Sequence, residues 1–219
     1  MDDKQKLKIE FWADYMCPLC YIGKTHLENA IIELQDKCTV EVIYRPFQLF
    51  PDAPVNTKRD YYEYTSMTHG GMPVVGVRAG NLKVVAMARS AGLNYDLDNL
   101  IPTNTTDALR ITLYAQEQGK AKELSAKIYQ AYLIKGQNIA DIETLTELAS
   151  QVGLGEQAIR EILSCDKYKS EVKAWRSLGE KQGIKGTPFF VINKKYSISG
   201  VKTKVEILDI LKKVSEIPQ

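Results

Sequence analysis

The chain has 219 residues, of which 29 are lysine or arginine, 27 are aspartate or glutamate, and 44% are apolar. A net charge of +2 without a dense run of lysine and arginine gives no sign of a nucleic-acid partner, so none is expected. No stretch reaches the roughly 18 consecutive apolar residues of a transmembrane helix, so no membrane partner is expected either.

The first six residues are polar, and no apolar segment with a small-residue cleavage site follows them. We therefore expect the protein to remain in the cytoplasm. Stable disulfides are disfavoured in that compartment. A closely spaced cysteine pair there is more often catalytic, redox-active or metal-binding than structural.

A strand, a helix and a second strand are predicted at the start of the chain. Apolar and polar residues alternate over residues 7–11 and Trp12 follows, and residues 21–36 carry apolar residues at helical spacing. Residues 38–44 alternate again and are rich in β-branched side chains. A strand–helix–strand unit of this size is expected to have parallel strands.

The centre of the chain is predicted to be helical. Residues 57–77 have a mixed pattern, and no element is predicted there. Helical periodicity predicts helices near 81–91, 105–118, 121–135, 141–152, 156–164 and 167–182. A helix C-terminus favours glycine, and five of these helices are followed by one: Gly92, Gly119, Gly136, Gly153 and Gly183.

The last part of the chain returns to mixed structure. Residues 189–192 and 196–199 predict two short strands around a turn, and apolar spacing over 205–214 predicts a final helix. The predicted fold class is therefore α/β. The simplest arrangement is one sheet domain from residues 1–56 and 185–219, with residues 57–184 inserted as a helical domain.

Cys17 and Cys20 lie where the first predicted strand ends and the first helix begins. A helix N-terminus has unpaired N–H groups and a partial positive charge, which favour a thiolate over a thiol. The thiolate is the form that attacks a disulfide, so a Cys-x-x-Cys at this place indicates redox exchange.

A zinc site and two inert thiols are the alternative interpretations of this pair. Zinc needs further Cys or His ligands, and the sequence has neither a second Cys-x-x-Cys nor a His-x-x-x-His. His26 and His69 are isolated. We therefore expect no metal at this site.

Three motifs carry a family resemblance: residues 11–23 (FWADYMCPLCYIG), 104–110 (NTTDALR) and 186–192 (GTPFFVI). A cysteine pair combined with a distant threonine–proline that opens a strand is a specific signature. The whole chain resembles the DsbA-like branch of the thioredoxin superfamily, most of all its FrnE-type cytoplasmic members. The resemblance implies a thioredoxin-like fold with a large all-helical insertion domain, and disulfide oxidoreductase activity.

The resemblance also implies roles for individual residues. Cys17 corresponds to the exposed attacking thiol and Cys20 to the more buried resolving thiol. Pro188 is expected to follow a cis peptide bond and to face the pair, and Thr187 to present its backbone to a bound substrate. A cis bond is plausible at this position because only X–Pro bonds adopt cis at modest cost. The alternative for Pro188 is an ordinary trans proline at the start of a strand.

Two positions depart from the family pattern. Pro18 and Leu19 lie between the cysteines and are expected to form part of the substrate-binding surface. The strongly oxidising periplasmic relatives carry a histidine in this dipeptide. Leucine offers neither charge nor hydrogen bond, so we expect a potential below the value of about −120 mV typical of those oxidants. The family usually has a histidine where this chain has Leu109, so contacts assigned to that histidine do not carry over.

Four further side chains have structural predictions. Asp14 is either a buried base that accepts a proton from Cys20 or a cap of the turn before the helix, and the sequence favours neither. His26 is predicted on the helix surface because it is not three or four residues from Cys20. Cys38 and Cys165 are predicted to be small buried apolar side chains. The alternative is a second redox pair between them, which no local motif supports.

Several large side chains in the unassigned segment have two interpretations. They either pack against the core, which is the commoner case, or line a substrate groove. These residues are Tyr61, Tyr62, Tyr64, Met67 and Met72.

The sequence therefore predicts a thiol–disulfide oxidoreductase that acts on protein or low-molecular-weight thiols and disulfides. It needs no bound metal or organic cofactor, and glutathione is a candidate co-substrate. One rival is a transferase or isomerase of the kappa glutathione transferase and 2-hydroxychromene-2-carboxylate isomerase type. Those relatives generally carry serine in place of Cys17 and lack the second cysteine. The other rival is a non-catalytic redox sensor.

Overall fold

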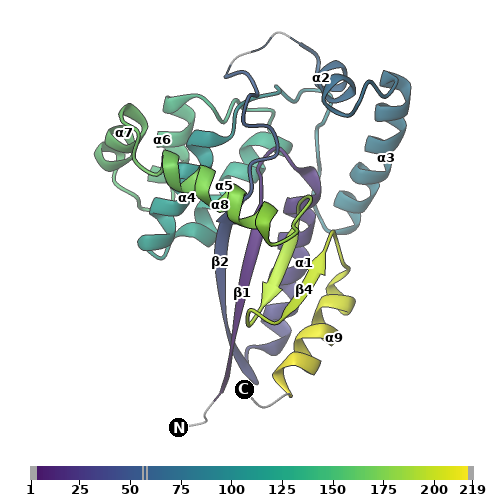
Figure 1. Cartoon of the computed structure of the whole chain (residues 1–219), viewed down its shortest axis with the longest axis vertical. Helices are drawn as coiled ribbons and strands as arrows, with labels where there is room; N and C mark the ends of the chain where they lie inside the picture. The colour runs from purple at the N-terminus through teal and green to yellow at the C-terminus, as the bar shows by residue number, and fades with distance from the viewer. Residues whose placement is uncertain (1–3, 56, 58, 217–219) are drawn as a thin grey trace.

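The computed structural model describes residues 4–55, 57 and 59–216, and within them the chain forms one four-stranded sheet surrounded by helices (Figure 1). The strand order is β2-β1-β3-β4. β1 pairs with β2 in parallel, and the other two pairings are antiparallel. The strands are β1 (Gln5–Ala13), β2 (Cys38–Pro46), β3 (Phe189–Ile192) and β4 (Tyr196–Ser199).

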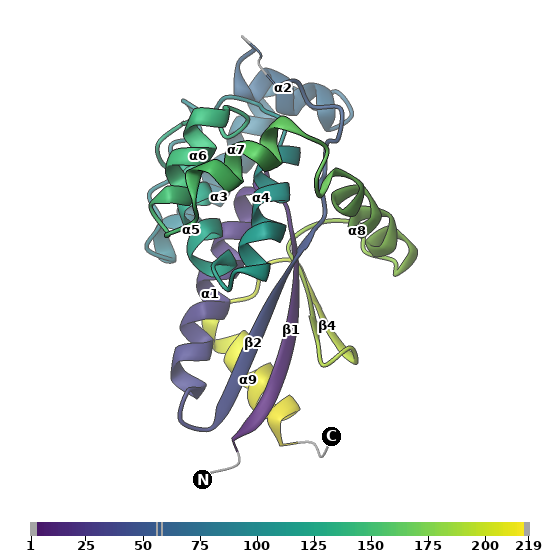
Figure 2. The same cartoon turned by 90° about the vertical axis from the view of Figure 1, so that its left-hand side faces the viewer.

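Helices cover both faces of this sheet, as Figure 2 shows edge-on. α1 (Pro18–Leu34) and α9 (Lys204–Ser215) lie together on one face, and α8 (Lys169–Lys181) lies on the other. The predicted parallel strand–helix–strand unit and the α/β class are confirmed. Strands from the two ends of the chain are neighbours, since β3 pairs with β1.

The remaining helices lie between β2 and β3 in the sequence. Helix predictions over residues 105–164 are confirmed to within a few residues at each end. The helices are α2 (Tyr61–Thr68), α3 (Val74–Ser90), α4 (Thr106–Glu117), α5 (Ala121–Leu133), α6 (Ile142–Ser150) and α7 (Glu156–Ser164). Each of the five glycines predicted to end a helix has a positive φ, between 62° and 81°.

The unassigned segment 57–77 contains α2 and the first turn of α3. Asp60 caps α2, because its carboxylate accepts hydrogen bonds from the N–H groups of Tyr62 and Glu63 at 2.8 and 3.2 Å. α2 has no continuous apolar stripe, and α3 contains two glycines within its first half. Both features weaken the helical periodicity that the sequence analysis depends on.

A small apolar cluster joins α8 to the sheet. Trp12 and Phe47 are buried together with Ile184, and Trp175 on α8 packs edge-on against Trp12 with ring centroids 5.9 Å apart. α8 therefore packs on the sheet, although it lies within segment 57–184. The division into domains stays a prediction, and its limits at residues 1, 56 and 219 fall outside the described residues.

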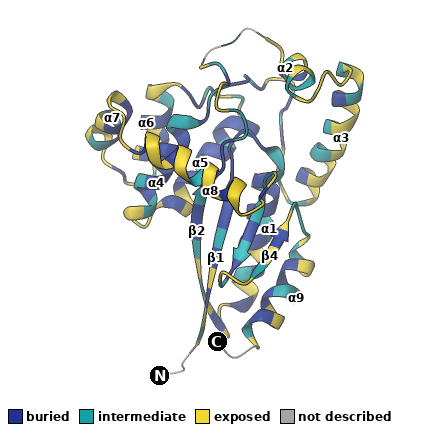
Figure 3. Ribbon diagram, viewed as in Figure 1, coloured by how far each residue is buried: buried dark blue, intermediate teal, exposed yellow. Residues whose placement is uncertain are grey.

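The main core is continuous from the sheet into the central helices. Its buried residues come from one side of the strands and from α1, α4 and α5 (Figure 3). Over the described parts of the chain, no helix combines the length and apolar character that a membrane crossing needs.

Candidate active site

The two cysteines lie at the N-terminus of α1. Cys17 is the N-cap residue and Pro18 occupies the first turn, where a missing N–H and a fixed φ suit a helix start. The Cys17 N–H donates to the Asp14 carbonyl at 3.2 Å, and the Cys20 N–H donates to the Cys17 carbonyl at 3.1 Å. Both cysteines are free thiols. The expectation of an exposed Cys17 is wrong, because the side chain is buried at 7% exposure, while Cys20 is fully buried.

The surroundings separate the acidities of the two sulfurs. A hydrogen bond from the Cys20 thiol lowers the pKa of Cys17, and the Thr187 side chain and the Cys20 N–H act in the same direction, while burial opposes them. Burial raises the pKa of Cys20 well above its ordinary value, and the hydrogen bond and negative charge at Cys17 raise it further. Cys17 is therefore the more readily ionised sulfur.

The loop before β3 faces the pair from the opposite end of the chain. The Thr187–Pro188 peptide bond is cis, as the family resemblance implies, and the Cys17 thiol donates to the Thr187 carbonyl at 3.4 Å. Thr187 is half-buried and Pro188 is buried. The structure thus brings Cys17, Cys20 and Thr187 together, although about 170 residues separate them in the sequence.

Gly23 allows this close approach, and the sequence analysis assigned it no role. A Cβ at this position would lie 3.2 Å from Pro188 Cγ and 3.3 Å from Phe190 Cζ, closer than ordinary van der Waals contact. A glycine inside a predicted helix, three residues after Cys20, is the signal that could have identified it. Its backbone leaves room for the proline loop above α1.

Asp14 is buried and holds the loop after β2. Its carboxylate accepts hydrogen bonds from the Leu49 N–H at 2.7 Å and from the Met16 N–H at 3.4 Å. Burial raises the pKa of this carboxyl, although these hydrogen bonds partly oppose the shift. The capping role is therefore present in the structure, and the proton-relay role stays a prediction.

A cavity of about 310 Å³ opens beside Cys17. Pro18, Leu19 and Thr187 line one side, and α2 and α3 form its roof. Tyr61 and Tyr64 line the cavity, and Tyr61 also packs in the core, while a substrate groove stays a prediction. The other three large side chains of the segment do not line it: Tyr62 is buried elsewhere, and Met67 and Met72 are exposed.

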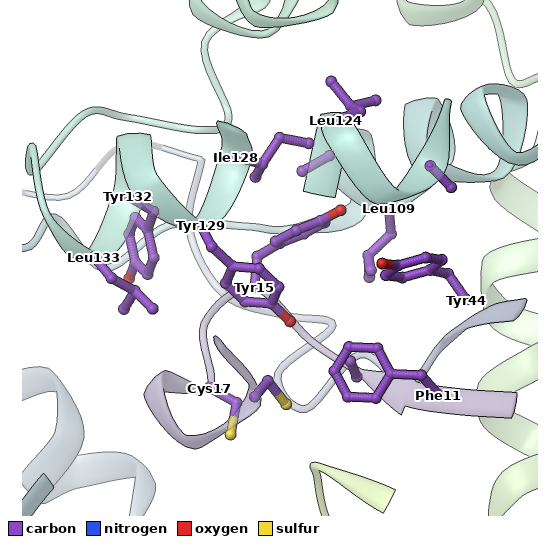
Figure 4. Packing of buried hydrophobic residues seen from close by; sticks show 14 of the residues in the cluster. Phe11, Tyr15, Cys17, Tyr44, Leu109, Leu124, Ile128, Tyr129, Tyr132 and Leu133 are labelled. Atoms are coloured by element: carbon purple, nitrogen blue, oxygen red, sulfur yellow. The ribbon is translucent and has the colours of Figure 1, made fainter. Parts of the chain in front are cut away.

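Tyrosines from α5 pack against the active-site turn (Figure 4). The Tyr129 hydroxyl donates to the Asp14 carbonyl at 3.2 Å, and its ring lies against Tyr15, with centroids 4.7 Å apart. Leu109 is buried nearby beside Phe11 and Tyr44, away from the residues that line the Cys17 cavity.

The other singled-out side chains lie away from the pair. His26 is half-buried on α1 and its Nδ1 contacts the Lys202 carbonyl at 2.7 Å. Cys38 is buried, as predicted. The prediction for Cys165 is wrong: it is exposed because it follows α7, where the chain leaves the helix in an extended conformation.

Among residues 4–55, 57 and 59–216, no group of three or more His, Cys, Asp and Glu side chains is arranged to hold a metal ion. The thiol pair supplies reactive groups of its own at this site. An acidic sulfur that lines a cavity, next to a fully buried and weakly acidic one, can form and then release a mixed disulfide.

Comparisons with known proteins agree with this geometry. The chain is 30% identical over 191 residues, 84% of its length, to the uncharacterised protein YwbO of Bacillus subtilis (strain 168), of which it covers 86%. A probable DsbA oxidoreductase from Streptomyces coelicolor superimposes with a TM-score of 0.88 and 27% identity, covering 97% of this chain and 92% of that one.

The cytosolic disulfide reductase DsbM from Pseudomonas aeruginosa, whose structure is also known with GSH, has the same fold at 17% identity. Its TM-score is 0.66, over 96% of this chain and 100% of that chain. Residues 8–211 match the model of one family along nearly the whole length. The chain belongs to the DSBA-like thioredoxin domain family.

Proposed function

We propose that this protein is a thiol–disulfide oxidoreductase in which Cys17 attacks the substrate and Cys20 resolves the intermediate. The observation that carries the proposal is the asymmetry of the pair. Cys17 caps a helix, borders the cavity and has a lowered pKa, whereas Cys20 is fully buried with a raised pKa. Such a difference assigns attack to one sulfur and resolution to the other.

The exchange balances without a further cofactor. The Cys17 thiolate attacks one sulfur of a substrate disulfide, the S–S bond breaks, and the other half leaves as a thiolate. Cys20 then loses its proton and attacks Cys17, which releases the second half. Two electrons and two protons pass to the substrate, and Cys17 and Cys20 become a disulfide.

Insulin reduction with a thiol donor tests this proposal. We expect turnover by the wild type, none by Cys17→Ser, and arrest of Cys20→Ser at a mixed disulfide that can be isolated with its partner. Cys38→Ser is the matched control, since Cys38 is a buried thiol outside the site. Turnover by a protein that lacks both Cys17 and Cys20 contradicts the proposal.

The proposed substrates are protein or low-molecular-weight thiols and disulfides, with glutathione as a candidate co-substrate. The proposed location is the cytoplasm. The proposed branch of the family is the FrnE-type branch. The fold shared with DsbM supports this assignment, because DsbM is a cytosolic disulfide reductase with a structure that contains GSH. Trapping partners on Cys20→Ser identifies the physiological substrate.

Two rival functions give different results in the same assays. 2-Hydroxychromene-2-carboxylate isomerase shares the fold at 12% identity, but an isomerase of that type does not need Cys20. Isomerase activity that survives Cys20→Ser would therefore favour it. A redox sensor would show no turnover with any disulfide but would bind a partner in only one oxidation state.

A further inference from the structure

Buried polar atoms without partners gather in the cavity beside Cys17. Among the described residues, five buried side-chain nitrogen or oxygen atoms have no hydrogen-bond partner. Three of the five belong to residues that line this cavity: Asn81 Nδ2 on α3, the Tyr132 hydroxyl on α5 and the Thr187 hydroxyl. Asn81 lies near Tyr61, and the Thr187 hydroxyl lies near both cysteine sulfurs, but neither makes a hydrogen bond of normal geometry with these neighbours.

An unpartnered buried polar group is unfavourable, so three at one place indicate a ligand that completes them. They come from three separate elements and surround one space next to the reactive sulfur. Figure 4 shows the Tyr132 ring extending from α5. Amide and hydroxyl groups are suited to bind uncharged carbonyl, amide or hydroxyl groups.

The cavity offers no fixed charge. None of the described side chains that line it is Asp, Glu, Lys or Arg. Its histidine, His69, is exposed to water, and its Nδ1 lies 3.0 Å from the Thr65 carbonyl. A carboxylate placed in this cavity would lose its water without gaining a cation, which is strongly unfavourable.

A second cavity provides the contrast. It has about 350 Å³ between α1 and β2, and its buried cation, Lys24, forms an ion pair with Glu28 at 2.8 Å. No residue that lines it has an unpartnered buried polar atom among the described residues. Of these two cavities, as far as the described residues show, the one beside Cys17 combines a thiol in its lining with polar groups that lack partners.

We propose that the cavity beside Cys17 is a specificity site for one uncharged, hydrogen-bonding arm of a low-molecular-weight disulfide. Asn81 and Tyr132 bind the arm, and Thr187 binds it close to the sulfur that Cys17 attacks. Arms with carboxylates, as in glutathione, bind there less favourably, so they react more slowly. This inference rests on the proposed thiol–disulfide exchange and follows the same steps: Cys17 bonds to the sulfur of the bound arm, the other half leaves as a thiolate, and Cys20 releases the arm.

The test measures single-turnover oxidation of the reduced protein by bis(2-hydroxyethyl) disulfide and by oxidised glutathione. The Cys17–Cys20 disulfide is quantified by alkylation and mass spectrometry. Each rate is divided by the rate of the same disulfide with dithiothreitol, which removes differences in intrinsic reactivity. We expect a normalised preference of at least about tenfold for the uncharged disulfide, since a charged arm must be desolvated without a partner.

Variants assign the preference to the cavity. Asn81→Leu and Tyr132→Phe should each slow oxidation by bis(2-hydroxyethyl) disulfide about three- to tenfold, because each removes one hydrogen bond to the arm. The rate of oxidation by oxidised glutathione should change little. Tyr114→Phe is the matched control, because Tyr114 lies on α4 and does not line the cavity. Tyr132→Phe should also raise the thermal midpoint, since it removes an unpartnered buried hydroxyl.

The outcomes separate the inference from the proposed function. If neither disulfide oxidises the pair, the proposed function fails. If both oxidise it but oxidised glutathione is as fast after normalisation, or the variants match the control, the specificity site is refuted. The same variants are also tested with a neutral peptide disulfide. If both variants slow oxidation by the peptide disulfide but not oxidation by bis(2-hydroxyethyl) disulfide, a site for small molecules is refuted.

Discussion

Replacing Gly179 by alanine tests the packing of α8 on the sheet. A Cβ at this position would lie 2.8 and 2.9 Å from two ring carbons of Phe47 and 3.0 Å from Trp12 Cζ3. Both rings are buried, with exposures of 5% and 0%, so neither can turn away without opening the cluster. Forced overpacking of this kind lowers the free energy of unfolding by about 1–3 kcal/mol.

The helical preference of alanine partly hides this loss. Alanine is more favourable than glycine inside a helix by about 1 kcal/mol. Gly80→Ala on α3 gains the same preference without a clash, because nothing lies within 4 Å of the added Cβ. The difference between the two variants therefore isolates the packing cost, and we expect Gly179→Ala to be less stable by about 1–3 kcal/mol.

Urea unfolding followed by tryptophan fluorescence measures both variants, since Trp12 and Trp175 lie in the cluster. If the two free energies of unfolding agree within about 0.5 kcal/mol, the spread of ordinary surface substitutions, α8 does not press on the sheet as described.

Three further predictions concern the thiol pair. Gly23→Ala places a Cβ 3.2 Å from Pro188 Cγ, so we expect slower mixed-disulfide formation. The free energy of unfolding should stay within about 1 kcal/mol of the wild-type value. An unchanged rate contradicts the role of Gly23. Cys20→Ala removes the hydrogen bond that lowers the pKa of Cys17, so the pH midpoint of Cys17 alkylation should rise, and equal midpoints would be inconsistent with that cause. Leu19→His should raise the reduction potential by tens of millivolts in titration against glutathione, and a wild-type potential near about −120 mV would refute the weak-oxidant prediction.

Local patterns predicted those elements whose own periodicity is strong. An apolar run of β-type residues over 189–192 and a short alternating segment over 196–199 predict both C-terminal strands with their observed bounds. The unpredicted α2 has a capping aspartate but no apolar stripe, and it is held partly by tyrosines that face the cavity. The stability of α2 depends on tertiary contacts, and the spacing of apolar residues in the sequence does not reveal such contacts.

The site was predictable in part for a similar reason. Cys17, Cys20 and the threonine–proline are short motifs, so the sequence identifies them without a structure. Asn81 and Tyr132 belong to no motif, and they acquire a role only because α3 and α5 bring them to one cavity. Cys165 was misplaced because the pattern near a helix end does not say whether the next residue stays in the core.

The roof of the cavity has a consequence for how this protein can diverge. The thiol pair lies at the start of α1 and faces the loop before β3, whereas the proposed specificity site takes Asn81 from α3, in the roof, and Tyr132 from α5. Changes in the roof can alter which molecules reach the sulfur and leave its chemistry intact. Exchanging the roof with that of a relative should transfer selectivity while the acidity of Cys17 stays as it was.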